Sequence, residues 1–155
     1  MENSIKKEKE PTLIKGGFAV DDRGMLTFAN DFDFNGVKRF YMVENFSPET
    51  IRAFHGHKNE AKYVFVVSGS AIVAAVEIDN TETPNKNNKA RRFVLSARNP
   101  GILFIPAGFA NGFRPLEHGT KIMFYSTSTL EESKGDDYRF PHNYWGKEIW
   151  EVENK

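Results

Sequence analysis

The sequence has 155 residues, in which 21 lysines and arginines balance 21 aspartates and glutamates, and it contains no cysteine. This length suits one domain with a real core, so we predict a single domain over residues 12–155 after a flexible charged tail, residues 1–11. Zero net charge gives no reason to expect a nucleic acid or membrane partner. The lack of cysteine excludes disulfides and thiol chemistry. No apolar run resembles a signal peptide or a membrane span, so we expect a cytoplasmic protein.

Short apolar runs separated by Gly, Pro, Asn and Asp follow one another along the chain. They predict strands at residues 12–19, 25–29, 38–46, 63–67, 71–76, 91–95, 101–105, 112–116 and 121–127. Ser68-Gly69-Ser70 predicts a hairpin turn between two of these strands, and residues 80–89 predict a polar loop. Helical turns are predicted only within residues 130–134 and 144–152. Many short strands without helical periodicity predict an all-β sandwich or barrel.

Ionisable residues gather just before the central strand at residues 63–67. Arg52, His55, His57 and Lys62 lie within eleven residues, in the outline of the first cupin motif, where two histidines and a glutamate bind a metal. Lys62 stands in the place of the glutamate, and Asn111 stands where a later turn supplies a third histidine. Because a protonated lysine repels cations, we predict a cupin frame without a metal or another cofactor.

The same residues make up a set of acid–base groups. A neutral His55 can abstract a proton near physiological pH. Lys62 and Arg52 offer positive charge for an enolate oxygen or a phosphate. Tyr125, on the predicted strand at residues 121–127, can return a proton from the opposite face. This combination suits proton abstraction next to a carbonyl group.

Several stretches resemble the dTDP-4-dehydrorhamnose 3,5-epimerase family, in the order found in that family. They are DDRG at residues 21–24, RAFH at 52–55, the lysine of AKYVFVVSG at 62, LSARNPGILFIPAGFANGF at 95–113 and IMFYSTST around Tyr125. The IPAGFANGF turn is the most specific of them. The resemblance implies a cupin-type jelly roll (a double-stranded β-helix) and a metal-free homodimer that acts on nucleotide sugars.

Carried over residue by residue, the resemblance makes His55 the base, Tyr125 the acid on the opposite face and Lys62 the partner of the C4 enolate. Arg52 then contacts the diphosphate or the sugar, and Arg23 contacts the phosphates across a dimer interface. The implied substrate is a dTDP-4-keto-6-deoxyhexose in deoxysugar or surface polysaccharide biosynthesis. The implied reaction inverts C3, C5 or both by removing a proton and returning it.

Three departures from the family pattern keep other functions open. Asn111 replaces a histidine, and the chain is expected to end before the aspartate that orients the base; no motif assigns that role to Asp136 or Asp137. The stretch RAFHGHK contains a second histidine, His57, and this resembles the H-x-H-K pattern of the related 3,4-ketoisomerases. A 3,4-ketoisomerase is therefore the first alternative to an epimerase. A non-catalytic sugar-binding cupin is a further alternative. The last alternative is a metal-dependent cupin enzyme that binds its metal through His55, His57 and Glu60. Of these alternatives it is the least compatible with the positive charge of Lys62.

Simpler interpretations exist for several of these residues. His57 also suits a hydrogen-bonded or surface histidine, and Arg23 a solvated turn residue. Tyr125 suits a core tyrosine whose hydroxyl finds a partner. Asn111, between glycines, suits a turn, although we expect it and Phe113 to contact substrate.

Overall fold

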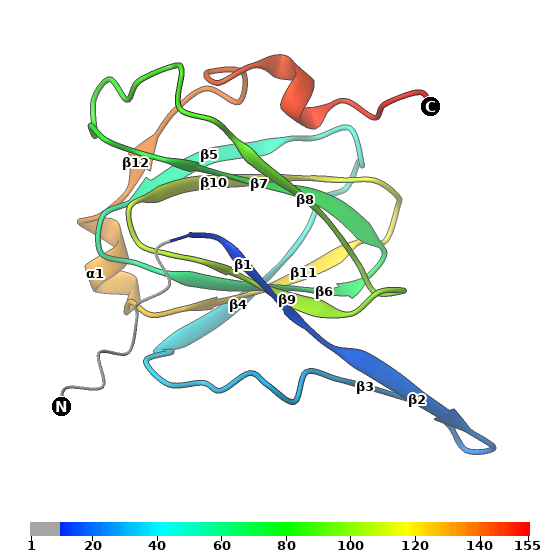
Figure 1. Cartoon of the computed structure of the whole chain (residues 1–155). Coiled ribbons are helices and arrows are strands. Elements are labelled where there is room, and N and C mark those ends of the chain that lie inside the picture. The colour runs from blue at the N-terminus through cyan, green and yellow to red at the C-terminus, as the bar shows by residue number, and fades with distance from the viewer. Residues whose placement is uncertain (1–9) are drawn as a thin grey trace, which may run out of the picture.

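The computed structural model describes residues 10–155 as two five-stranded antiparallel sheets packed face to face (Figure 1). The first sheet has the order β1 (Thr12–Lys15), β9 (Gly101–Ile105), β6 (Lys62–Ser68), β11 (Lys121–Ser126) and β4 (Arg39–Glu44). The second has the order β12 (Tyr138–Arg139), β5 (Arg52–His57), β10 (Phe109–Pro115), β7 (Ser70–Glu77) and β8 (Arg91–Ser96). The predicted all-β jelly-roll architecture is confirmed.

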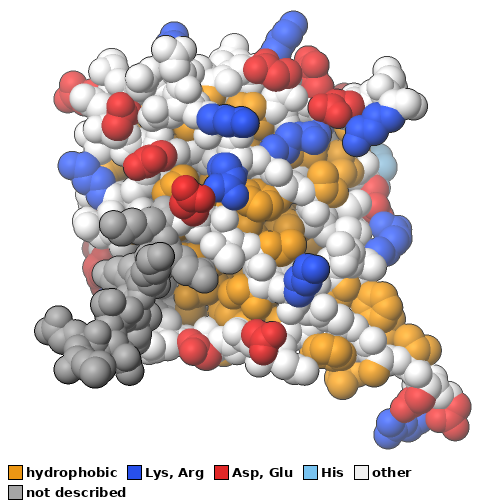
Figure 2. All heavy atoms as spheres, in the orientation of Figure 1, with side chains coloured by type: hydrophobic (Ala, Val, Ile, Leu, Met, Phe, Trp, Pro, Cys, Tyr) orange, Lys and Arg blue, Asp and Glu red, His pale blue; other side chains and the backbone are white. Residues whose placement is uncertain are grey.

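A two-stranded hairpin, β2 (Gly17–Asp21) and β3 (Gly24–Phe28), projects from the sandwich as an arm (Figure 1). The predicted first strand therefore splits at Gly16, where a Cβ atom would lie 2.3 Å from the carbonyl oxygen of Phe28. The arm exposes large apolar side chains, with Val20 71%, Met25 62% and Leu26 66% exposed. Figure 2 shows hydrophobic side chains along the arm and charged ones at its tip. Nothing within the described chain covers this apolar surface.

The helical segments lie where the sequence predicts helical turns. They are α1 (Leu130–Lys134), whose N-cap Thr129 accepts a hydrogen bond from the backbone of Glu132, and the 3-10 helix η1 (Lys147–Trp150). Neither of these helices in residues 10–155 has the length and apolar character needed to cross a membrane. Most of the predicted tail, residues 1–9, lies outside the described residues. Its last part is attached, because Glu10 Oε2 lies 2.9 Å from Arg91 Nη1.

The predicted hairpin around Gly69 is wrong, although the turn lies where it was predicted. β6 pairs with β9 and β11 in the first sheet, whereas β7 pairs with β8 and β10 in the second. Gly69 has a φ of 77°, and a Cβ atom there would lie 2.3 Å from Thr120 Oγ1. This glycine therefore lets the chain cross from one sheet to the other instead of folding back within a sheet.

Two hydrophobic cores hold the sandwich together. The first lies between the sheets and includes Val64, Leu103 and Ile122, each 0% exposed. The second covers the outer face of the second sheet and is completed by the C-terminal segment. Strand β7 is buried on both faces, which explains its unbroken apolar run at residues 71–76.

The C-terminal segment is fixed to the sheet by aromatic packing and by two arginines. Trp150 is 1% exposed, its ring lies 5.4 Å from that of Phe54, and its Nε1 donates to the carbonyl of His142 at 2.8 Å. Arg92 Nε donates to the carbonyl of Ile149 at 2.9 Å, and Arg114 Nη1 to that of Trp150 at 2.6 Å. The segment is thus part of the core.

We expect Trp150→Ala to lower the free energy of unfolding by about 3–5 kcal/mol, because it leaves a large cavity in the second core. Val152→Ala, at a neighbouring side chain that is 64% exposed, is the control and should change stability by less than about 0.5 kcal/mol. Urea unfolding followed by tryptophan fluorescence and circular dichroism measures both. Equal effects of the two substitutions would contradict the second core.

Candidate active site

A cavity of about 360 Å³ opens between the two sheets. Its lining is rich in positive charge, with five lysines or arginines against one ionisable carboxylate, that of Asp137. The lining residues are Arg39, Tyr41, Val43, Arg52, His55, His57, Lys62, Asn111, Phe113, Phe124, Leu130, Ser133, Lys134, Asp137 and Arg139. An excess of fixed positive charge in a concave site favours an anionic ligand.

Strand β5 places three of the predicted residues on the cavity wall. Arg52 pairs with Phe113 and His55 pairs with Asn111 on β10, and the register shifts between these two pairs. Because Asn111 and Phe113 are two residues apart, the irregularity turns Arg52 and His55 to the same face. His57 follows two residues later on that face. The sequence predicted no strand at residues 52–57, whereas the structure has a strand there with one shift of register.

His55 has a carboxylate partner, which the sequence did not identify. Asp137 Oδ1 lies 3.7 Å from His55 Nδ1, and Arg139 Nε lies 3.1 Å from Asp137 Oδ2. Burial lowers the pKa of His55, Lys62 lowers it further, and Asp137 partly opposes both. His55 is therefore neutral at pH 7, with Nδ1 directed to a carboxylate, as a general base requires.

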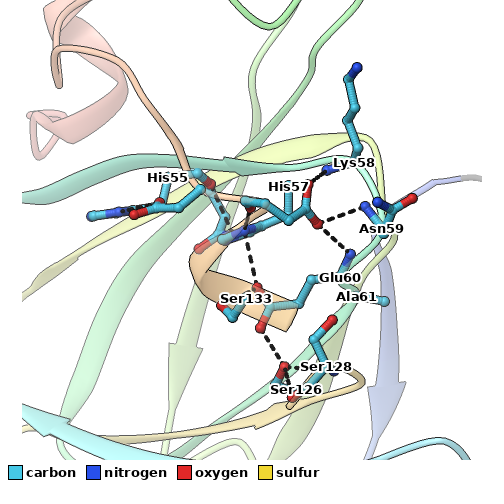
Figure 3. A network of polar contacts seen from close by, with 12 residues as sticks. His55, His57, Lys58, Asn59, Glu60, Ala61, Ser126, Ser128 and Ser133 are labelled. Atoms are coloured by element: carbon cyan, nitrogen blue, oxygen red, sulfur yellow. Dashed lines mark hydrogen bonds and ion pairs between the residues drawn. The ribbon is translucent and has the colours of Figure 1, made fainter. Parts of the chain in front are cut away.

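His57 lies deeper, in a buried polar network (Figure 3). Its Nδ1 lies 2.6 Å from the carbonyl oxygen of Asp136 and 3.0 Å from Glu60 Oε2. Glu60 also accepts hydrogen bonds from Ser126 and Ser133 and is 3.3 Å from Arg39 Nη2. The interpretation of His57 as a surface histidine is therefore wrong, because only 4% of the residue is exposed.

Lys62 is a buried ammonium group without a counter-ion among residues 10–155. The residue is 7% exposed, and its Nζ lies 5.8 Å from the centre of the Tyr41 ring and 5.9 Å from that of Phe124. Aromatic faces stabilise a cation weakly compared with a carboxylate. The arrangement suits an anion supplied by a ligand.

Tyr125 does not line the cavity, which corrects the expectation that it faces His55. Residues alternate along β11, so Phe124 points inward and Tyr125 outward. The Tyr125 ring lies 5.2 Å from that of Phe34 and 6.0 Å from that of Phe32, on the outer face of the sheet. The tyrosine inside the cavity is Tyr41 of β4, stacked on Phe124 with ring centres 5.1 Å apart.

The other predicted residues lie in three different places. Asn111 is in β10 and not in a turn, and its Nδ2 lies 3.4 Å from the carbonyl oxygen of His55. Phe113 is 5% exposed and belongs to both the inner core and the cavity wall. Arg23 is at the tip of the arm, paired with Asp21 and 86% exposed, and does not reach the cavity of its own chain.

Sequence reasoning missed Tyr41 and Arg39 as parts of the site, considered Glu60 only as a metal ligand, and left Asp137 without a role. The alternation of β4, which turns Arg39, Tyr41 and Val43 to one face, is the signal that could have found two of them. Asp137 has no such signal, because the tertiary fold brings it to β5. Within residues 10–155, no three His, Cys, Asp or Glu side chains form a group that could hold a metal ion.

Comparison with known proteins identifies the family. The model of the dTDP-4-dehydrorhamnose 3,5-epimerase family matches residues 9–141. The chain belongs to this family. Membership makes it an isomerase-type enzyme with the cupin-type fold, as the sequence predicted. The chain is also 29% identical over 124 residues, 78% of its length, to the spore coat polysaccharide biosynthesis protein SpsL of Bacillus subtilis (strain 168), of which it covers 81%.

Two solved structures share the fold with different reactions in their names. The RmlC epimerase of Mycobacterium tuberculosis has a TM-score of 0.72 at 17% identity, covering 88% of this chain and 72% of that one. The sugar 3,4-ketoisomerase QdtA of Thermoanaerobacterium thermosaccharolyticum, in complex with TDP, has a TM-score of 0.64 at 20% identity, covering 89% and 93%. At these identities the likeness establishes the fold alone.

We expect Asp137→Asn to lower the pKa of His55 further, because it removes the negative charge that raises this pKa against burial and Lys62. A lower pKa keeps the imidazole neutral to lower pH but makes it a weaker base. NMR titration of the His55 ring protons measures the shift. Asp33→Asn, at an exposed loop carboxylate, is the control. An unchanged or raised pKa in Asp137→Asn would contradict the pairing.

Proposed function

We propose that this protein epimerises a carbon next to the C4 ketone of a nucleotide-linked 4-keto-6-deoxyhexose, a dTDP sugar in deoxysugar or surface polysaccharide biosynthesis. The observation that carries the proposal is that His55 and Lys62 line the same cavity. Asp137 lies beside His55, and Lys62 is a buried ammonium group without a counter-ion among the described residues. A base beside a fixed positive charge suits removal of a proton next to a carbonyl group, since the negative charge then moves to the ketone oxygen.

We assign one residue of the cavity wall to each step. The His55 Nε2 atom takes the proton from C3 or C5, and the electron pair moves onto the C4 oxygen, where the Lys62 ammonium group stabilises the enolate. Tyr41 then gives its hydroxyl proton to the carbon from the opposite face, and the ketone re-forms. Exchange with solvent returns a proton to Tyr41 and removes one from His55. Because Tyr41 is on β4 and His55 on β5, the acid and base come from opposite sheets.

Substrate binding uses the rest of the positive lining. Arg52, whose Nε is held by Asn45 Oδ1 at 2.6 Å, is placed at the wall to contact the diphosphate or the sugar. His57, Asn111 and Phe113 complete the wall around the sugar. We also propose that the protein acts in the cytoplasm, as expected from the sequence.

A 3,4-ketoisomerase is the second candidate, and His57 is the observation that favours it. Carbonyl migration removes a proton from C3, transfers the hydroxyl proton from O3 to O4 and returns a proton to C4, which two imidazoles on the same wall can do, one as the base and the other in its protonated form. His55 and His57 are two residues apart on one face of β5. The proposed epimerase reaction instead uses His55 and Tyr41, which lie on opposite walls of the cavity.

We also propose a homodimer, in which the arm of one copy covers the outer face of the first sheet of the other. Apolar side chains on both surfaces support it, including Val20 and Leu26 on the arm and Phe40 and Met42 on β4, which are between 52% and 71% exposed. A two-stranded ribbon is marginal in water on its own. In this dimer Arg23 at the tip of the arm reaches the substrate phosphates in the partner's cavity.

Incubation with dTDP-4-keto-6-deoxyglucose in deuterated water tests the proposed reaction. We expect deuterium at C3 or C5 with inverted configuration, detected by NMR and mass spectrometry, and loss of roughly two to four orders of magnitude in rate in His55→Ala. A ketone at C3 would instead assign the ketoisomerase reaction. No exchange with any nucleotide-linked keto sugar would overturn the proposal in favour of a binding protein.

Two matched substitutions locate the acid in the same assay. Tyr41→Phe should abolish most inversion while deuterium still exchanges on the original face, because His55 still acts without its opposite partner. Tyr125→Phe, on the outer face of β11, should keep nearly full turnover. The reverse pattern would return the acid role to Tyr125.

For the dimer, we expect sedimentation equilibrium to give twice the chain mass, and Val20→Lys/Leu26→Lys to give monomers with unchanged circular dichroism. Charged side chains on the arm disfavour its burial. The control is Val152→Lys, which changes an exposed apolar residue outside the arm and outside β4. This variant should remain dimeric. Monomeric wild-type protein at micromolar concentration would contradict the interface.

A further inference from the structure

The buried imidazole of His57 has a defined tautomer. Its Nδ1 lies within hydrogen-bond distance of the Asp136 carbonyl oxygen and of Glu60 Oε2, at 2.6 and 3.0 Å (Figure 3). A carbonyl oxygen only accepts hydrogen bonds, and so does an ionised carboxylate. Nδ1 must therefore carry a hydrogen. In the neutral ring, Nε2 then carries the lone pair.

This Nε2 atom is buried and has no hydrogen-bond partner in the described part of the chain. The side chain is 5% exposed and contributes to the wall of the cavity beside His55. A buried acceptor is unfavourable until a donor reaches it. Nε2 is therefore the ring nitrogen that is left to take up a proton.

The Glu60 carboxyl group lies on the Nδ1 side of the ring. Its side chain is fully buried, and its oxygens accept from Ser126, from Ser133 at 3.1 Å and from Arg39 Nη2 at 3.3 Å. An arginine and two hydroxyl donors stabilise the ionised form of a buried carboxylate. The reaction proposed above uses neither hydroxyl group, and the carboxyl group that they contact lies 3.0 Å from His57 Nδ1.

We propose that Glu60 is a positioning residue for His57: it fixes the imidazole at the cavity wall with Nε2 as the unprotonated ring nitrogen, and it supplies the negative charge that stabilises the ring when Nε2 takes up a proton. The inference rests on the proposed function, in which a keto sugar occupies the cavity. It adds a second histidine–carboxylate pair, His57–Glu60, beside His55–Asp137.

The charges around His57 agree with this role. Burial lowers the pKa of His57 and Lys62 on β6 lowers it further, whereas Glu60 and Asp136 raise it. The same wall also carries His55, two residues earlier on β5, and the ionisable groups of Tyr41, Arg52, Lys134, Asp137 and Arg139, while Arg39 lies on the other side of Glu60. Removing the negative charge of Glu60 therefore leaves Lys62 less opposed, and the pKa of His57 should fall.

NMR of protein labelled with ¹⁵N at histidine tests this without substrate. The chain has four histidines, so His57→Gln, His118→Gln and His142→Gln assign the signals. In wild-type protein at neutral pH we expect a protonated Nδ1 and an unprotonated Nε2 for His57. In Glu60→Gln the tautomer should persist through the Asp136 carbonyl, while the titration midpoint of His57 moves to lower pH. Glu132→Gln, an exposed carboxylate on α1, should leave it unchanged.

Glu60→Gln leaves Arg39 without its carboxylate, so Arg39→Gln/Glu60→Gln, a neutral pair, provides a second variant. It should show the same fall in the His57 midpoint, since Glu60 and not Arg39 acts on that ring. In turnover, Glu60→Gln should lower kcat about tenfold with KM within about twofold. A protonated Nε2 in wild-type protein, or equal midpoints in wild type and both variants, would overturn the inference. If the expected NMR shifts occur with no turnover on any keto sugar, the proposed function fails and the positioning role stands.

Discussion

The site depends on one buried carboxylate, that of Asp136. Its two oxygens accept the backbone N–H groups of Lys58, Asn59 and Glu60 at 2.7, 2.8 and 3.1 Å, which closes the loop between β5 and β6. The carbonyl of the same residue accepts from His57 Nδ1 at 2.6 Å. One residue thus joins the segment after α1 to the strand that carries both histidines. Because Asp137 follows directly, the same attachment brings a carboxylate to His55.

The sandwich makes this attachment possible by burying the second sheet on both faces. The inner face packs on the first sheet, and the outer face packs on a C-terminal segment led by Trp145, Ile149 and Trp150. The chain passes from α1 through β12 to that segment, so the packing that covers the sheet also holds residues 136–139 against β5. Gly112 contributes at β10, where a Cβ atom would lie 2.3 Å from the Cβ of Ala53 on β5, and this close approach keeps the two strands carrying His55 and Asn111 together.

Local patterns in the sequence predicted what depends on local chemistry. Alternation and turn residues located most strands, and His55 and Lys62 were recognised because their spacing stands out beside an apolar strand. The pairing of β6 with β7 could not be predicted in this way, since a Gly-containing turn serves a hairpin and a crossing between sheets equally well. Tyr125 was misplaced for a related reason: a shift of one residue on β11 exchanges the inner face for the outer one. Asp137 and His55 are 82 positions apart in the sequence, and the periodicity of apolar residues predicts only contacts within one strand or helix.

The placement of acids and bases on walls links this fold to its choice of reaction. In the proposed epimerisation, opposite sheets supply His55 and Tyr41, one for each face of a flat enolate, whereas in the proposed ketoisomerisation β5 alone supplies His55 and His57 on one face. Both proposed reactions, inversion at a carbon and migration of the carbonyl, therefore use the same cavity. The difference between the two depends on which group carries a proton once the enolate exists. Glu60, fully buried beside His57, adds a negative charge on the β5 side, while Arg39 and Lys62 lie over the Tyr41 ring at 5.0 and 5.8 Å. The negative charge therefore lies beside the His57 imidazole and the positive charges lie beside the Tyr41 ring, so in the proposed reaction the two walls present opposite charges to the same enolate.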